Sequence, residues 1–267
     1  GCLMAAFLRW PEFCRAPTMS DNNFQQPRSL PQFQRVSVDC LAIGPSQPNP
    51  PIQSLYVRGT FDPGTADTCR ISIVGSRDAS PAAMHWTQAI ARSCSRRGFI
   101  VVSGGARGID SAAHVGALLQ GGVTWWVAGT SIDRIYPACH KGLFRDVVAH
   151  GGAMISEVGP QVNSGKYMFR LRNRIIAALG DALLVVAAGA QSGTLSTVEY
   201  ARSMGKPIFV PPRNEVPETA GVEMLRGSQG IRTYRGENVL TELSKCRARC
   251  IGPESLRGKV SSTTSAK

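Results

Sequence analysis

The stretch Val101–His114, VVSGGARGIDSAAH, carries the main evidence about fold class. It continues an apolar run that begins at Ile100 and is typical of the end of a buried strand. The chain then turns through Gly104 and Gly105, and we expect a helix from about Ile109. Where a strand ends in small residues and leads into a helix, backbone N–H groups and the positive end of the helix dipole favour a bound anion.

Two features of this turn favour a phosphate as that anion. Arg107 carries a guanidinium that can hold a phosphate through two parallel hydrogen bonds. Glycines such as Gly105 and Gly108 let the backbone approach an anion without a clash at Cβ. The alternative is an ordinary β–α turn with one surface arginine, and this stretch alone does not separate the two.

The chain of 267 residues is basic, with 30 Lys and Arg against 18 Asp and Glu, which gives a formal net charge of +12. Such a balance favours an anionic partner, with nucleic acid ahead of an acidic membrane surface. A hydrophobic fraction of 43% is sufficient for a sizeable core. Because no apolar run reaches the roughly 18 residues of a membrane span, we expect no membrane partner.

The eight cysteines are spread along the whole chain, without a CxxC pair and without the Cys/His spacing of a zinc site. We therefore expect no bound metal and a reduced, cytoplasmic protein. The first ten residues, GCLMAAFLRW, are too short and too poorly flanked to be a convincing signal peptide.

Composition divides the chain into three expected regions. Residues 1–50 are rich in Pro, Gln and Asn, which predicts a mostly disordered arm. Residues 51–243 are expected to form the core domain, closed by Val239 and Leu240. Residues 244–267 are basic and rich in Ser and Thr, which predicts a flexible tail.

Within the core, apolar runs alternate with helix-like segments at the spacing of βαβ units. The expected strands are 71–74, 99–102, 123–128, 153–155, 183–187 and 207–210, with a further short run at 55–57. The expected helices are 82–97, 109–120, 142–150, 169–179 and 195–204. This alternation predicts an α/β fold with a Rossmann-like, doubly wound and mostly parallel sheet.

Small residues and hydroxyls follow four of these strands. In a parallel sheet the carboxyl ends of the strands share one edge, where ligands bind. We therefore expect a phosphate-binding crevice at this edge. Its residues follow the strands as Gly75, Ser76 and Arg77, then Ser103, Gly104 and Gly105, then Gly129 and Thr130, and finally Ser192, Gly193 and Thr194.

A second signal is the run Lys166–Arg174, KYMFRLRNR, in which basic and aromatic residues alternate. Guanidinium groups hold phosphates, and aromatic faces stack on unpaired bases. A solvated helix start is the alternative for an isolated run of this kind. Beside the glycine-bearing turns, we interpret it as a contact to a nucleic-acid backbone with little sequence preference.

Other chemistries are less well supported. The turns lack GxGxxG with a following acid, and GxxxxGK[ST] is missing, which disfavours a dinucleotide cofactor and an ordinary P-loop. Asp110 and His114 share a helix face, but we expect Asp110 to bond at the helix start and His114 to pack beneath the turn. Glu157 and Glu199 are isolated acids without a visible partner, so no catalytic residue is assigned.

Taken in order, these motifs resemble the DNA-processing protein A (DprA/Smf) family over about residues 55–243. The resemblance rests on IVGSR at 73–77, VSGGARGID at 102–110, Asp133 with Tyr136 and Pro137, ISE at 155–157, RNRIIA at 172–177 and SGT at 192–194. It implies a protein that is not an enzyme and needs no cofactor. Such a protein would bind single-stranded DNA as a homodimer, protect incoming DNA in natural transformation and help to load a RecA-type recombinase.

The resemblance also implies where DNA binds. The contacts that it carries over are Arg77, Ser103, Gly104, Arg107, Lys166, Phe169, Arg172, Asn173 and Arg174. We expect alanine at Arg77 or Arg174 to weaken binding of all DNA sequences. The chain departs from the family pattern in having Gly105 where Leu is more usual, and Arg170-Leu171 where a proline usually precedes the RNR arginine.

An enzyme with a similar fold is the alternative. The lysine-decarboxylase-like phosphoribohydrolases use the motif PGGxGTxxE. The corresponding stretch here, GAQSGTLST at 189–197, lacks Pro-Gly-Gly and has Thr197 in place of the catalytic acid. A nucleotide sensor that keeps only the pocket is a further possibility.

Overall fold

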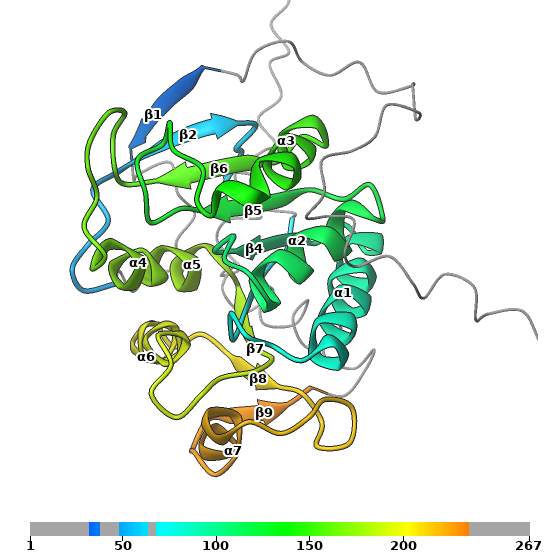
Figure 1. Cartoon of the computed structure of the whole chain (residues 1–267). Helices are drawn as coiled ribbons and strands as arrows, with labels where there is room; N and C mark the ends of the chain where they lie inside the picture. The colour runs from blue at the N-terminus through cyan, green and yellow to red at the C-terminus, as the bar shows by residue number, and fades with distance from the viewer. Residues whose placement is uncertain (1–31, 38–47, 64–67, 235–267) are drawn as a thin grey trace, which may run out of the picture.

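Nine strands form one open sheet in the part of the chain that the structure describes, residues 32–37, 48–63 and 68–234 of a computed structural model (Figure 1). Their order across the sheet is β1-β2-β6-β5-β4-β3-β7-β8-β9. Every neighbouring pair from β6 across to β9 is parallel. At the other edge, β1 pairs antiparallel with β2, and β2 pairs antiparallel with β6. The strands are β1 (Phe33–Ser37), β2 (Ser54–Gly59), β3 (Arg70–Val74), β4 (Ile100–Ser103), β5 (Thr124–Val127), β6 (Ala153–Ser156), β7 (Ala182–Val185), β8 (Ile208–Val210) and β9 (Ile231–Thr233).

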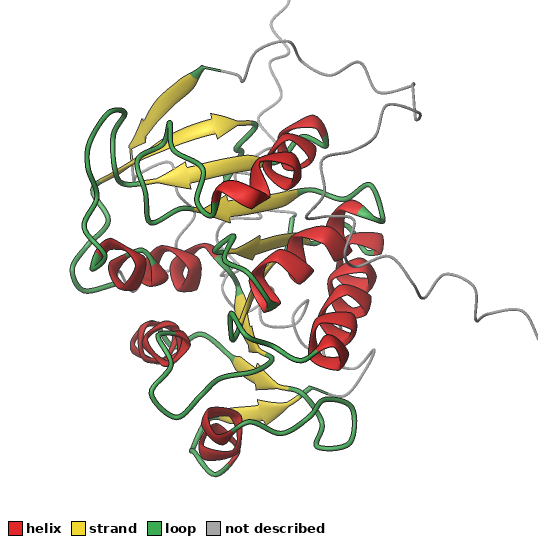
Figure 2. Cartoon of the chain, in the orientation of Figure 1, coloured by secondary structure: helices red, strands yellow, loops and turns green. Residues whose placement is uncertain are grey.

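Helices cover both faces of this sheet, as Figure 2 shows. Alternate residues of one strand serve opposite faces: Ile71 and Ile73 pack with α1 and α2, while Val74 packs with α5 and α6. The third helix on the α1 side, α3, covers Trp126 and Met154. The helices are α1 (Pro81–Arg96), α2 (Ile109–Leu118), α3 (Lys141–Ala149), α4 (Met168–Leu171), α5 (Asn173–Leu179), α6 (Thr194–Ser203) and α7 (Ala220–Arg226), with a 3₁₀ turn, η3 (Ala138–His140).

The predicted fold class, a Rossmann-like and mostly parallel α/β sheet, is confirmed. Short sequence signals at the ends of the helices explain part of this agreement. At the start of α1, the Ser80 hydroxyl accepts a hydrogen bond of 3.2 Å from the Ala83 N–H, and Pro81 occupies the first helical turn. The single helix expected over 169–179 is two short helices, because the chain tightens at Arg172, whose carbonyl accepts from the Ile175 N–H at 2.8 Å.

Strand β1 lies within residues 1–50, for which the composition predicted a mostly disordered arm. This strand was not anticipated. It pairs antiparallel with β2, with Gln34 opposite Val57. Four of its five residues are exposed, so an edge strand of this kind leaves no apolar pattern in the sequence. Residues 1–31 and 38–47 of the arm, Val239, Leu240 and the expected tail at 244–267 lie outside the described residues.

Candidate nucleic-acid interface

A pocket of about 380 Å³ lies where β3 and β7 adjoin. From β3 the chain winds outward through β4, β5 and β6, and it then returns to β7 on the other side of β3. This is the topological switch point, at which open α/β sheets bind ligands. The lining residues are Val74, Gly75, Ser76, Arg77, Asp78, Ala106, Asp110, Phe169, Arg170, Arg172, Asn173, Ile176, Ser192, Gly193, Thr194 and Thr197.

The structure therefore brings together most of the residues expected at the crevice. Those that line the pocket are Gly75, Ser76, Arg77, Phe169, Arg172, Asn173, Ser192, Gly193 and Thr194. Three charged lining residues were absent from the predicted site: Asp78, Asp110 and Arg170. Asp78 could have been found because it follows Arg77 directly, and Arg170 because it lies within the basic–aromatic run Lys166–Arg174.

Arg172 is the central charge of the pocket. It is 4% exposed, and its Nε and Nη1 atoms have no hydrogen-bond partner among the described residues. Its guanidinium lies directly on Gly104, where an added Cβ would be 1.7 Å from Nη1. Burial, opposed by nearby Asp110 and reinforced by Arg77, lowers the pKa of Arg172 to about 10. The group remains cationic at neutral pH, with unused donors in a pocket.

Asp110 lies next to this guanidinium and is almost fully buried. Its Oδ2 accepts a hydrogen bond of 3.3 Å from the Ala106 N–H, which confirms the predicted bond at the start of the helix. Burial raises the pKa of Asp110, and the positive charge of Arg172 opposes that shift. The carboxylate therefore helps to keep the arginine charged and holds the turn after β4 in place.

His114 packs beneath the turn, as expected. Its ring is stacked on Trp126, with the centroids 5.3 Å apart, and its Nδ1 lies 2.7 Å from the Thr124 hydroxyl. Because the Thr124 proton is donated to the Val101 carbonyl, Nδ1 must be the protonated nitrogen of the ring. Burial lowers the pKa of His114 to about 3, so this side chain is neutral and structural.

The rim of the pocket combines a cation with an aromatic face. The Arg77 guanidinium carbon lies 5.9 Å from the centroid of the Phe169 ring, within the range of a cation–π contact. Gly129, in the turn after β5, lies close to this ring, because an added Cβ there would be 2.9 Å from Phe169 Cδ1. A guanidinium and an aromatic ring thus lie side by side at the rim.

Hydroxyl and amide groups tie the turn after β7 to the turn after β3. Thr194 Oγ1 donates to the Gly75 carbonyl at 3.2 Å, and Ser192 Oγ donates to Thr194 Oγ1 at 3.0 Å. The Asn173 amide donates to the Gly193 carbonyl at 3.0 Å. These bonds position the pocket wall before any ligand arrives.

Two of the backbone N–H groups expected to face an anion are used within the fold instead. The Ile109 N–H at the start of α2 donates to the Ser76 carbonyl at 3.1 Å. The Thr194 N–H at the start of α6 donates to the Ser192 hydroxyl at 3.2 Å. Both helix starts use these donors within the fold, so the arginine side chains, rather than these N–H groups, supply the positive charge of the pocket.

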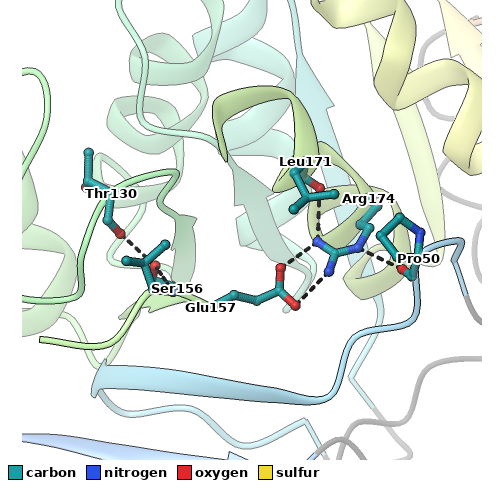
Figure 3. Close-up of polar contacts among 7 residues, drawn as sticks. Pro50, Thr130, Ser156, Glu157, Leu171 and Arg174 are labelled. Carbon is teal, nitrogen blue, oxygen red and sulfur yellow. Dashed lines mark hydrogen bonds and ion pairs between the residues drawn. The ribbon is translucent and has the colours of Figure 1, made fainter. Parts of the chain in front are cut away.

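Arg174 does not line the pocket, although it was expected to contact DNA. Figure 3 shows its guanidinium facing Glu157, with Nη1–Oε2 and Nη2–Oε1 distances of 2.5 and 2.7 Å. Its Nε donates to the Pro50 carbonyl at 2.8 Å, and Nη1 also donates to the Leu171 carbonyl at 3.1 Å. The side chain is 4% exposed. Arg174 therefore joins three segments of the fold, and the description of Glu157 as an isolated acid was wrong.

Other predicted contacts also shape the site without lining it. The Ser103 hydroxyl is buried and donates to the Ile73 carbonyl at 2.6 Å. Gly105 has φ +70° and faces Trp126, and Gly108 has φ +75° and lies against the Ser76 carbonyl. Both conformations favour glycine, so these residues are needed for the course of the backbone. Gly104, as described above, makes room for Arg172, whereas Arg107 and Lys166 are exposed outside the pocket.

The sequence and the fold match known proteins. A family model described as DNA recombination-mediator protein A matches residues 43–244. Protein Smf of Synechocystis sp. is 37% identical over 199 residues, 73% of this chain and 48% of that protein. DNA processing protein DprA of Streptococcus pneumoniae is 37% identical over 158 residues, 59% of this chain and 55% of that protein. The chain thus spans about half the length of these two curated relatives.

Two solved structures share the architecture. DNA processing protein A from Helicobacter pylori, studied for its mode of binding single-stranded DNA, matches with a TM-score of 0.68 and 29% identity. That match covers 80% of this chain and 97% of the other. The Streptococcus pneumoniae DprA structure matches with a TM-score of 0.67 and 30% identity, and covers 79% of this chain and 74% of the other.

Within the described ranges, no helix combines the length and the apolar character that crossing a membrane requires. The family model covers most of the chain. The Streptococcus pneumoniae relative and both solved structures are named DNA processing protein A or DprA, and the Synechocystis relative is named Smf. The chain belongs to the DNA recombination-mediator protein A family, the DNA-processing proteins also named DprA and Smf.

Proposed function

We propose that the pocket between β3 and β7 binds single-stranded DNA with little sequence preference. The observation that carries the proposal is Arg172, a buried guanidinium that lines the pocket with two nitrogens unpartnered in the described structure. A buried cation with unused donors is costly unless an anion completes it. Arg77 and Arg170 add two further cations to the same pocket.

The aromatic rim favours a nucleic acid over a small anion. Phe169 lines the pocket and carries Arg77 across its face. Bases stack on aromatic rings regardless of their identity, which gives affinity without sequence readout. Only an unpaired strand exposes its base faces for such stacking, and this favours single strands over a duplex.

The wider role follows the family. The relatives named DNA processing protein and the family description, recombination-mediator protein, support a place in natural transformation, in which the protein would protect incoming DNA and help to load a RecA-type recombinase. We further propose a homodimer in the cytoplasm. The cysteines that the structure describes as free, Cys69, Cys94 and Cys139, are consistent with a reducing compartment.

Binding is favoured over the phosphoribohydrolase alternative by one observation. At the place where that enzyme class carries its catalytic acid, the pocket is lined by Thr197, which is 1% exposed. Glu199, two residues further along α6, points to solvent as an exposed residue. We therefore propose a binding protein that does no covalent chemistry in this pocket.

A salt titration tests the proposal. We expect a labelled single strand to bind more tightly than the matching duplex, as measured by fluorescence anisotropy, with affinity falling steeply as salt rises. Arg77→Ala should weaken binding to all sequences and reduce the slope of log K against log salt by about 1, because one phosphate contact is lost.

The matched control is Arg92→Ala. Arg92 is also exposed, but it lies near the other end of α1 and bonds to Gln120 at 3.3 Å. It should leave the slope as in the parent protein. Equal affinity for single and double strands, or equal slopes for Arg77→Ala and Arg92→Ala, would reject the proposed site.

A further inference from the structure

Tyr136 is an exposed aromatic residue beside the pocket, and the site described above does not use it. Its side chain is on the surface with 50% of its area exposed. Its ring lies 5.2 Å from the Phe169 ring between centroids, at an interplanar angle of 60°. Since Arg77 lies over Phe169, the three side chains form a continuous series that leads from the pocket rim onto the turn before η3.

The loop that carries Tyr136 is held firmly in place. The Ser156 hydroxyl donates to the Thr130 carbonyl at 2.6 Å, and the Thr130 hydroxyl donates to the Arg134 carbonyl at 2.7 Å. The Ile132 N–H donates to the Val158 carbonyl at 3.0 Å, and the Ile132 side chain is fully buried. An exposed ring on a fixed loop loses little conformational freedom when a flat partner stacks on it.

Exposed apolar side chains also occur on the same loop and on the segment that leads into α4. Of the six large hydrophobic residues that are exposed in the described chain, three lie on this loop and on the segment that leads into α4: Tyr136, Val162 and Tyr167. Lys166 is exposed on the same segment. Alternating cations and aromatic rings outside the core are typical of surfaces that bind a single strand.

We propose that Tyr136 is a second base-stacking surface, which receives the base next to the nucleotide held at the pocket. The strand would then run from Arg77 across Phe169 to Tyr136. This inference rests on the proposed function, because it extends the same DNA path by one residue. Stacking of a base on Tyr136 would add affinity without adding a phosphate contact.

Binding by two variants tests this role. We expect Tyr136→Ala to weaken binding of an oligothymidylate by about 5-fold or more, the loss expected for one base–aromatic stack. Tyr136→Phe keeps the ring and should stay near the parent affinity. Both variants should keep the parent salt slope, since no phosphate contact changes.

Leu119→Ala is the control for loss of exposed apolar surface. Leu119 is 60% exposed at the C-terminal end of α2, whereas the pocket lies at the N-terminal end of that helix. Its affinity should equal that of the parent, and all variants should melt at the parent temperature. Parent-like affinity of Tyr136→Ala, or a reduced salt slope in that variant, would overturn the inference.

Cross-linking locates the contact directly. An oligonucleotide that carries 5-iodouracil at successive positions should, on irradiation, cross-link to Tyr136 at a position adjacent to the one that cross-links to Phe169. Cross-links to Phe169 without any to Tyr136 would remove the inference and leave the proposed function intact. If the parent protein does not bind single strands at all, both proposals fail together.

Discussion

Arg172 and Arg174 are two residues apart, almost equally buried, and used in opposite ways. Arg174 places its guanidinium against Glu157 and two backbone carbonyls (Figure 3). Arg172 lies against Gly104 near Asp110, and its Nε and Nη1 find no partner in the part of the chain that the structure describes. One arginine completes the fold, and the other leaves bonding capacity for a ligand.

The comparison teaches that burial alone does not identify a functional cation. Removing one partner of a buried ion pair leaves an uncompensated charge, so Arg174 should matter for stability. Arg172 has a nearby charge in Asp110 but leaves Nε and Nη1 without hydrogen bonds in the described structure, so it should matter more for binding than for stability. Substitution of Arg174 is therefore expected to reduce stability more than affinity, and substitution of Arg172 to reduce affinity more than stability.

The largest expected effect is on stability. Arg174→Ala leaves the Glu157 carboxylate, 14% exposed, without its partner, and should lower the free energy of unfolding by about 3–5 kcal/mol. Urea denaturation measures this loss. The double variant Arg174→Ala/Glu157→Gln should recover part of it, because no unpaired charge remains. If Arg174→Ala is as stable as the parent, the structural role assigned to Arg174 is wrong.

A smaller effect is expected at Arg172, and it concerns affinity. Arg172→Met keeps most of the side-chain volume and should weaken single-strand binding at least about 10-fold, equivalent to about 1.4 kcal/mol. Its free energy of unfolding should fall by less than that of Arg174→Ala, because Asp110 loses a nearby positive charge but keeps its hydrogen bond to the Ala106 N–H. Anisotropy and urea denaturation on the same preparation measure both. A variant that unfolds as readily as Arg174→Ala, or that binds as tightly as the parent, would contradict this assignment.

The smallest effect concerns a third buried base, His114, which lies beneath the same turn in its neutral form. Its pKa in the fold is about 3, below the unfolded value of 6.5, so the unfolded chain binds the extra proton between these values. The stability that neutral His114 contributes is therefore almost fully present at pH 7.5 and declines as the pH falls through 6.5 towards 3. The decline should reach about 1 kcal/mol between pH 7.5 and 6.

His114→Asn tests this decline, because its amide can still donate to the Thr124 hydroxyl but does not titrate. Urea midpoints measured across this pH range should fall less steeply in the variant than in the parent. If both lose stability in parallel, His114 is not the group that titrates.

Local patterns in the sequence were enough to predict most of the architecture. Apolar runs such as Ile71–Val74, separated by helical segments, predicted a parallel sheet, because strands covered on both faces need continuous apolar residues. The Ser80 cap and Pro81 in the first turn explain why α1 begins close to the expected residue 82. Glycine-bearing turns after several strands predicted the ligand edge, since all parallel strands end on the same side.

Long-range contacts settled what each polar residue does there. Arg172 and Arg174 belong to the same short motif. Arg174 nevertheless bonds to two groups from other parts of the chain, the Glu157 carboxylate just after β6 and the Pro50 carbonyl. The strand β1 likewise gains its stability from pairing with β2 rather than from its own composition. The periodicity of apolar residues indicates which face of a strand or helix is buried. The partners of a buried polar group, in contrast, come from segments that are distant in the sequence. Only the folded structure shows which of these segments pack together.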